Sequence, residues 1–125
     1  MRASSFNEYA ERILKAIEAV LATGQAVLVD QTIDQRSMLR GFIGGTLHFE
    51  DGSELHFREF ADITLDEPRV MYAYHYQDAS RNLIFRYDNA AHKPPISQAE
   101  HKHTSQGIHA AKAPAFEAVI NEILG

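Results

Sequence analysis

The stretch between residues 46 and 58 restricts the fold of this chain more than any other part of the sequence. Two runs of alternating apolar and polar side chains flank the triplet Glu50-Asp51-Gly52. A three-residue loop, with Gly52 in the left-handed conformation, pairs Leu47 with Leu55 and gives a hairpin with one apolar face. A two-residue loop would mix the faces. The apolar face holds Leu47, Phe49, Leu55 and Phe57, and the polar face holds Thr46, His48, Glu54, His56 and Arg58.

This first hairpin is predicted over residues 38–49 and 53–63. Glycines in its first strand predict a bend or bulge there, and they are Gly41, Gly44 and Gly45. A second hairpin is predicted over residues 69–77 and 82–88. Alternation places one side of each of its strands in the core: Val70, Tyr72, Tyr74 and Tyr76 on the first strand, and Leu83, Phe85 and Tyr87 on the second.

Helices are predicted at both ends of the chain. Apolar residues recur every three or four positions from 5 to 23, before Gly24, and again from about 114 to 124. Residues 26–29 indicate a buried strand, and residues 90–107 are interpreted as an irregular loop. The sequence thus predicts an α+β fold over 1–125 as one domain, with a single antiparallel sheet of about five strands flanked by N- and C-terminal helices. We expect both helices to pack on the face that holds Leu47, Phe49, Leu55, Phe57, Tyr74 and Phe85.

Composition excludes several classes of function. The 125 residues contain no cysteine, which rules out disulfides, thiolate metal sites and thiol nucleophiles. The formal net charge of −5 argues against strong nonspecific binding to nucleic acid, but residues 81–125 hold four of the seven histidines and more basic than acidic side chains. We therefore expect an anionic ligand to bind this last third. Neither a signal peptide nor a membrane-spanning run is present, which predicts a cytoplasmic protein without membrane association.

Histidine is the residue type best able to carry chemistry here, because the sequence has no phosphate-binding glycine loop, nucleophile elbow or metalloprotease motif. Two imidazoles can act as base and acid at neutral pH. In RNA cleavage one would take the proton of a 2′-hydroxyl and the other would protonate the leaving 5′-oxygen, while cations stabilise the phosphoryl oxygens. The expected cations are Arg58, Arg86 and Lys102, and Asp88 is expected to orient an imidazole.

The histidine-rich segment is expected to fold back over the polar face of the sheet. That would bring His92, His101 or His103 within reach of three sheet residues, His75, Arg86 and Asp88. In an extended backbone His101 and His103 point to one side, and Lys102 points to the other. A structural, hydrogen-bonded role is an equal alternative for His75, and both His48 and His56 are interpreted as solvated surface residues.

The second hairpin and the segment after it resemble the TumE family of small proteins. The resemblance lies in Tyr74-His75-Tyr76-Gln77-Asp78, the run from Asn82 to Ala90, His92 and His101-Lys102-His103. It implies the toxin of a type II toxin–antitoxin pair with ribonuclease activity. Two places depart from the family pattern: Ala91 replaces a proline, and Ala99-Glu100 adds a negative charge beside the expected phosphate site. The positions that match the family's polar motif are His75, Arg86, Asp88, Asn89, His92, His101 and His103.

Residues and resemblance together predict a metal-independent endoribonuclease toxin that uses histidine acid–base catalysis, needs no cofactor, acts on RNA and is held by a cognate helix-turn-helix antitoxin. Homodimerisation is left open. The expected catalytic residues are His75, Asp88, His92, His101 and His103, and the expected substrate-binding residues are Arg58, Arg86, Asn89 and Lys102. Two alternatives remain. One is a non-catalytic binding domain, and the other is a metal-dependent hydrolase, because imidazole and carboxylate side chains are zinc and manganese ligands.

Overall fold

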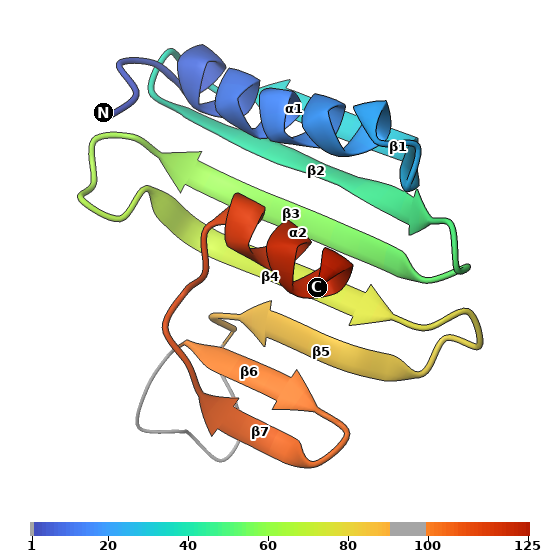
Figure 1. Cartoon of the computed structure of the whole chain (residues 1–125). Helices are drawn as coiled ribbons and strands as arrows, with labels where there is room; N and C mark the ends of the chain where they lie inside the picture. Colours follow the sequence, from blue (N-terminus) through green and yellow to red (C-terminus); the bar gives the residue numbers. More distant parts are fainter. Residues whose placement is uncertain (1, 91–99) are drawn as a thin grey trace.

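The computed structural model describes residues 2–90 and 100–125, and in these ranges it contains two helices and one antiparallel sheet of seven strands (Figure 1). The strands lie side by side in chain order, from β1 to β7. The elements are α1 (Phe6–Ala22), β1 (Ala26–Gln35), β2 (Arg40–Phe49), β3 (Glu54–Asp62), β4 (Arg69–Gln77), β5 (Leu83–Asp88), β6 (His101–Thr104), β7 (Gly107–Ala110) and α2 (Phe116–Leu124).

Both helices pack on one face of the sheet, α1 across β1 and β2 and α2 across β3 and β4 (Figure 1). The side chain of Ser5 caps α1 by accepting a hydrogen bond from the Glu8 N–H at 3.1 Å. The apolar stripes of the helices meet the expected sheet residues in one core, which confirms the predicted α+β fold and the face on which the helices pack. That core includes Ile13, Ile17, Val119, Ile120, Leu47, Phe49, Leu55, Phe57, Tyr74 and Phe85.

The hairpin between β2 and β3 has the predicted register. Gly52 has a φ of 88°, in the left-handed region, and the Phe49 N–H donates to the Ser53 carbonyl oxygen at 2.8 Å. Leu47 therefore lies opposite Leu55 and faces the helices. The other face of this hairpin is not covered by a helix, and the side chains of its alternate residues are directed away from the core.

Strand β1 differs from the predicted buried strand over 26–29. It runs for ten residues at the edge of the sheet, and the only buried residue in it is Ala26. Val27 and Val29 are 61% and 58% exposed. The prediction was wrong because α1 covers only one side of this edge strand, so that half of the apolar run faces solvent.

The glycines of β2 do not mark a bulge in the hairpin, because the register between β2 and β3 is regular over its whole length. The irregularity lies on the other side of β2, where the pairing of β1 shifts between Leu28 and Asp30. A Cβ atom at Gly45 would lie 2.6 Å from the carbonyl oxygen of Asp30, and one at Gly41 would lie 2.5 Å from the Phe6 ring. These two glycines thus allow neighbouring atoms to lie close to the backbone of β2, and they do not bend the strand.

The sheet has two strands more than the predicted five. β6 and β7 form within and just beyond residues 90–107, which were interpreted as an irregular loop, and β6 pairs with β5. Two predicted core residues are also outside the core. Val70 is 51% exposed, because the pairing of β3 with β4 skips it, and Leu83 is half-buried where the pairing of β4 with β5 is irregular. A skipped residue interrupts the alternation on which that prediction depended.

A buried carboxylate joins α1 to the sheet. Glu59 on β3 is 1% exposed and accepts hydrogen bonds from the hydroxyls of Tyr9 on α1 and Tyr74 on β4. Burial raises the pKa of Glu59 above its ordinary value, although the two hydroxyls and the charge of Arg69 act in the opposite direction. Between the unfolded-state pKa and the raised folded-state pKa the native protein holds a proton that the unfolded chain releases.

We expect the free energy of unfolding to fall as pH rises through this window, and replacement of Glu59 by glutamine to remove that fall. Glutamine stays uncharged and still accepts a hydrogen bond through its carbonyl oxygen. The fall is measured by chemical denaturation at a series of pH values above 4.5, the ordinary pKa of a glutamate, and it should be absent from Glu59→Gln. The matched control is Glu11→Gln on the exposed side of α1, which should keep the wild-type pH dependence.

Candidate functional site

The cross-strand register aligns polar side chains from five strands on the face opposite the helices, which we call the open face. One row runs across the sheet through Thr46, His56, His75, Arg86 and His103. The next row runs through Gly44, Arg58, Ala73, Asp88 and His101. Because neighbouring strands lie about 5 Å apart, the sheet alone brings these residues into one region.

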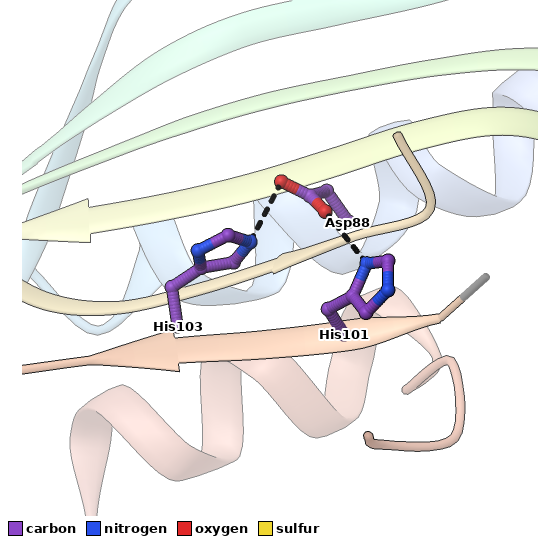
Figure 2. A group of neighbouring side chains, drawn as sticks. All are labelled: Asp88, His101 and His103. Atoms are coloured by element: carbon purple, nitrogen blue, oxygen red, sulfur yellow. Dashed lines mark ion pairs between the residues drawn. The ribbon is translucent and has the colours of Figure 1, made fainter. Parts of the chain in front are cut away.

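Three side chains from β5 and β6 form a buried cluster on the open face (Figure 2). The Asp88 carboxylate lies between two imidazoles: Oδ1 is 3.6 Å from His101 Nδ1, and Oδ2 is 3.4 Å from His103 Nε2. The side chains of Asp88 and His101 are only 5% and 2% exposed, and that of His103 is 18% exposed. The expected approach of the histidine-rich segment to Asp88 is therefore present, but it arises because the segment adds a strand to the sheet.

Arg86 links this cluster to His75. Its Nε donates to Asp88 Oδ2 at 2.8 Å, and its Nη1 lies 3.4 Å from His75 Nδ1. Burial raises the pKa of Asp88, but the hydrogen bond from Arg86 and the neighbouring His103 and Arg86 charges outweigh burial, so the net direction is downward. Asp88 is therefore a carboxylate at neutral pH, and it holds the guanidinium group toward the open face.

The surroundings of His75 favour its neutral form. A guanidinium group can only donate hydrogen bonds, so Nδ1 accepts from Arg86 while Nε2 donates to Gln77 Oε1 at 3.1 Å. Burial lowers the pKa of His75, and the charges of Arg86 and His56 lower it further, whereas the contact with Gln77 acts in the opposite direction. His75 is thus a neutral imidazole at neutral pH, which is the protonation state that a general base requires.

A hollow of about 410 Å³ lies on the open face, and its wall combines two imidazoles with two guanidinium groups. Ala73 lies between the longer side chains of the neighbouring strands and lines the hollow. Across the described ranges, 2–90 and 100–125, no acidic side chain forms an ion pair with Arg58. The residues that line the hollow include His56, Arg58, Ala73, His75 and Arg86.

His56 is the member of this hollow that the sequence did not single out. Its Nε2 lies 3.1 Å from Glu54 Oε2, and its Nδ1 lies 3.0 Å from Thr46 Oγ1. The ring centroids of His56 and His75 are 6.2 Å apart. His56 was interpreted as a solvated surface residue, and 45% of its side chain is indeed exposed, but the exposed part borders the hollow. The signal available in the sequence was that His56 and His75 both occupy polar-face positions.

Three residues named from the sequence, Lys102, Asn89 and Glu100, do not join the site. Lys102 points to the helix-covered side, where its Nζ lies 2.9 Å from Glu122 Oε2. Asn89 is bonded to the backbone of β4, accepting from the Tyr72 N–H and donating to the Val70 carbonyl oxygen, both at 3.1 Å. Glu100 accepts from the Ala113 N–H, so its charge lies away from the open face. His92 lies outside the described residues.

The fold and the open face define a small α+β protein in which one sheet is covered by helices on one side and carries a hollow lined by histidine and arginine on the other. The family model described as Toxin TumE matches residues 13–125. The chain therefore belongs to the TumE toxin family, as the resemblance in the sequence indicated. Comparison with curated proteins and with solved structures gives no match. Among the described residues, neither helix combines the length and the apolar character needed to cross a membrane.

Proposed function

We propose that this toxin is an endoribonuclease and that the hollow on the open face binds the scissile phosphate. The observation that carries the proposal is the presence of two imidazoles and two guanidinium groups on the wall of one hollow, contributed by three adjacent strands. Guanidinium groups bind phosphate oxygens through paired hydrogen bonds and remain charged at any physiological pH. Imidazoles supply the base and the acid that transesterification of RNA requires.

His75 is the general base in this proposal. When Arg86 turns from His75 Nδ1 to the phosphate, Nδ1 removes the proton from the 2′-hydroxyl, and O2′ then attacks the phosphorus atom and expels the 5′-oxygen. His56, next to the Glu54 carboxylate, delivers a proton to the leaving 5′-oxygen. Arg58 and Arg86 stabilise the negative charge that develops on the phosphoryl oxygens. The products are a 2′,3′-cyclic phosphate and a 5′-hydroxyl.

The buried cluster has a different part in this proposal from the direct catalysis expected from the sequence. His101 is almost completely buried, so a substrate in the hollow has no direct access to its ring. Asp88 acts as a positioning residue, because its contact with Nε fixes the guanidinium group of Arg86. The proposed reaction does not use His92 or Lys102.

A cognate antitoxin that holds the toxin inactive is the second part of the proposal. The exposed edge of β1 supports it, because this ten-residue strand presents Val27 and Val29 to solvent beside backbone groups to which a further strand can bond. A gene for a small helix-turn-helix protein next to the toxin gene is the expected context. Size-exclusion chromatography of the toxin alone detects any homodimer. The same measurement on a mixture of toxin and antitoxin detects the toxin–antitoxin complex.

The reaction is tested with the purified toxin and a defined RNA in buffer without Mg²⁺. We expect cleavage that leaves 2′,3′-cyclic phosphate ends, identified by mass spectrometry. No step of the proposed reaction uses Mg²⁺.

The matched control is the same RNA with a single 2′-deoxy nucleotide at the cleavage site. It should resist cleavage at that position, because it lacks the attacking hydroxyl, and still be cleaved elsewhere. Cleavage of the 2′-deoxy position, or products with 5′-phosphate ends that form only with Mg²⁺, would contradict the proposed chemistry.

A further inference from the structure

The geometry points to a zinc site built from Asp88, His101 and His103, a site that the proposed acid–base chemistry does not use. One ligand atom from each of these side chains can be chosen so that all three lie within 4.8 Å of one another. His101 Nδ1 lies 3.6 Å from Asp88 Oδ1, and His103 Nε2 lies 3.4 Å from the other carboxylate oxygen, Oδ2. Zinc binds nitrogen and oxygen at about 2.0–2.2 Å, so two ligands of a tetrahedral site lie about 3.3–3.6 Å apart. Binding of an ion would draw the three ligand atoms closer together than the 4.8 Å within which they now lie.

The donor set selects the metal. Two imidazole nitrogens and one carboxylate oxygen suit zinc, whereas Mg²⁺ and Ca²⁺ prefer oxygen ligands throughout. The chain has no cysteine to favour softer ions. The described residues supply three of the four ligands of a tetrahedral site.

The backbone holds this donor set in place. His101 lies directly opposite Asp88 in the antiparallel ladder, and His103 lies opposite Arg86, so two hydrogen-bonded strands fix all three ligands. Arg86 Nε binds Asp88 Oδ2 at 2.8 Å and so orients the carboxylate toward the two imidazoles. A second hydrogen-bonded layer of this kind orients ligands in metal sites. His103 is the most exposed of the three ligands, with 18% of its side chain exposed, so the ion enters the site beside His103.

An ion at this position would act on both stability and charge. Strands β5 and β6 share only three residue pairs, and β6 continues into a β7 whose four residues are all exposed. A metal bridging Asp88 to two residues of β6 would fasten this hairpin to the rest of the sheet. Its charge would also add to that of Arg86, which borders the hollow.

The proposal is tested by titrating the metal-stripped full chain with Zn²⁺, and with Co²⁺ as a spectroscopic probe. We expect one equivalent to bind, the intense visible absorption of four-coordinate Co²⁺, and a rise in Tm of about 5–10 °C at a Zn²⁺ concentration about 100-fold above Kd. Mg²⁺ at the same concentration should leave the Tm unchanged. These measurements need no RNA, so their outcome is separate from that of the ribonuclease assay.

His103→Ala and Asp88→Asn are expected to weaken Zn²⁺ binding at least about 100-fold, since loss of an outer-layer partner alone costs 10- to 100-fold. The matched control is His109→Ala on β7, an exposed histidine opposite Lys102 that should leave the affinity unchanged. If either variant fails to fold, the other variant and the Co²⁺ spectrum of the wild type decide the question. Octahedral Co²⁺ spectra, no Tm shift with Zn²⁺, or equal affinity in His103→Ala and His109→Ala would overturn the zinc site.

Discussion

Replacement of His75 by alanine is expected to slow RNA cleavage by about 10²-fold or more while the protein stays folded, because general base catalysis usually contributes a factor of about 10²–10⁴. His75 is half-buried on the open face, and its ring contacts are with Arg86, Gln77 and the neighbouring His56. None of these contacts belongs to the hydrophobic core. Circular dichroism and Tm should therefore change little, and the loss should appear in kcat rather than in RNA binding.

The pH profile gives a readout that a purely structural role for His75 would not change. The groups that face it are His56 and Arg58 on β3, and Arg86 and Asp88 on β5. Burial lowers the pKa of His75, so the wild-type rate should rise with pH through a value below 6.5. The alanine variant should lose this acidic limb, and added imidazole should restore part of its rate.

The matched control is His48→Ala, which removes an imidazole from the same face but outside the hollow. It should cleave at the wild-type rate. Equal loss in His48→Ala and His75→Ala would contradict the assignment of the base, as would a His75→Ala enzyme that keeps both its rate and its acidic limb.

The fold was predictable where apolar alternation and turn chemistry act together. Gly52 determined the length of one loop, and that length determined which residues of β2 and β3 face the helices. The edge strand β1 was predicted less well, because an apolar run such as 26–29 does not reveal whether one or both of its sides are covered. Strand β6 carried no signal of this kind, since His101 to Thr104 contains no apolar residue. These residues form a strand because their backbone pairs with that of β5.

The candidate site was predictable in part for the same reason. Alternation placed His75, Arg86 and Asp88 on one side of the second hairpin, and the structure keeps them together. The register between β3 and β4 depends on the connection after Asp62, whose geometry the sequence did not determine, so the approach of His56 to His75 was not predicted. Asn89 shows the opposite case: its type suggested substrate binding, but its amide bonds the backbone of β4.

Phe57→Ala is expected to cost about 3–5 kcal/mol of the free energy of unfolding, the usual range for removing a buried phenylalanine side chain. The ring is 3% exposed and lies 5.0 Å, between centroids, from Phe116, so it joins β3 to α2. On its other side lies Gly45, where an added Cβ would be 3.2 Å from the ring. Because Gly45 has no side chain that could move into the vacated space, the cavity should stay open and the cost should lie in the upper part of the range.

Arg58→Ala is the matched substitution, one residue along the same strand and on the open face. It should change the free energy of unfolding by no more than about 0.5 kcal/mol in chemical denaturation, because an exposed side chain leaves no cavity. The contrast between the two variants tests the register itself, since a shift of one residue would exchange the faces. If Arg58→Ala lowered the free energy of unfolding by several kcal/mol and Phe57→Ala left it unchanged, His56 and His75 would not share the open face. Because most domains are stable by about 5–15 kcal/mol, the expected loss in Phe57→Ala is large enough to decide this in a single denaturation series.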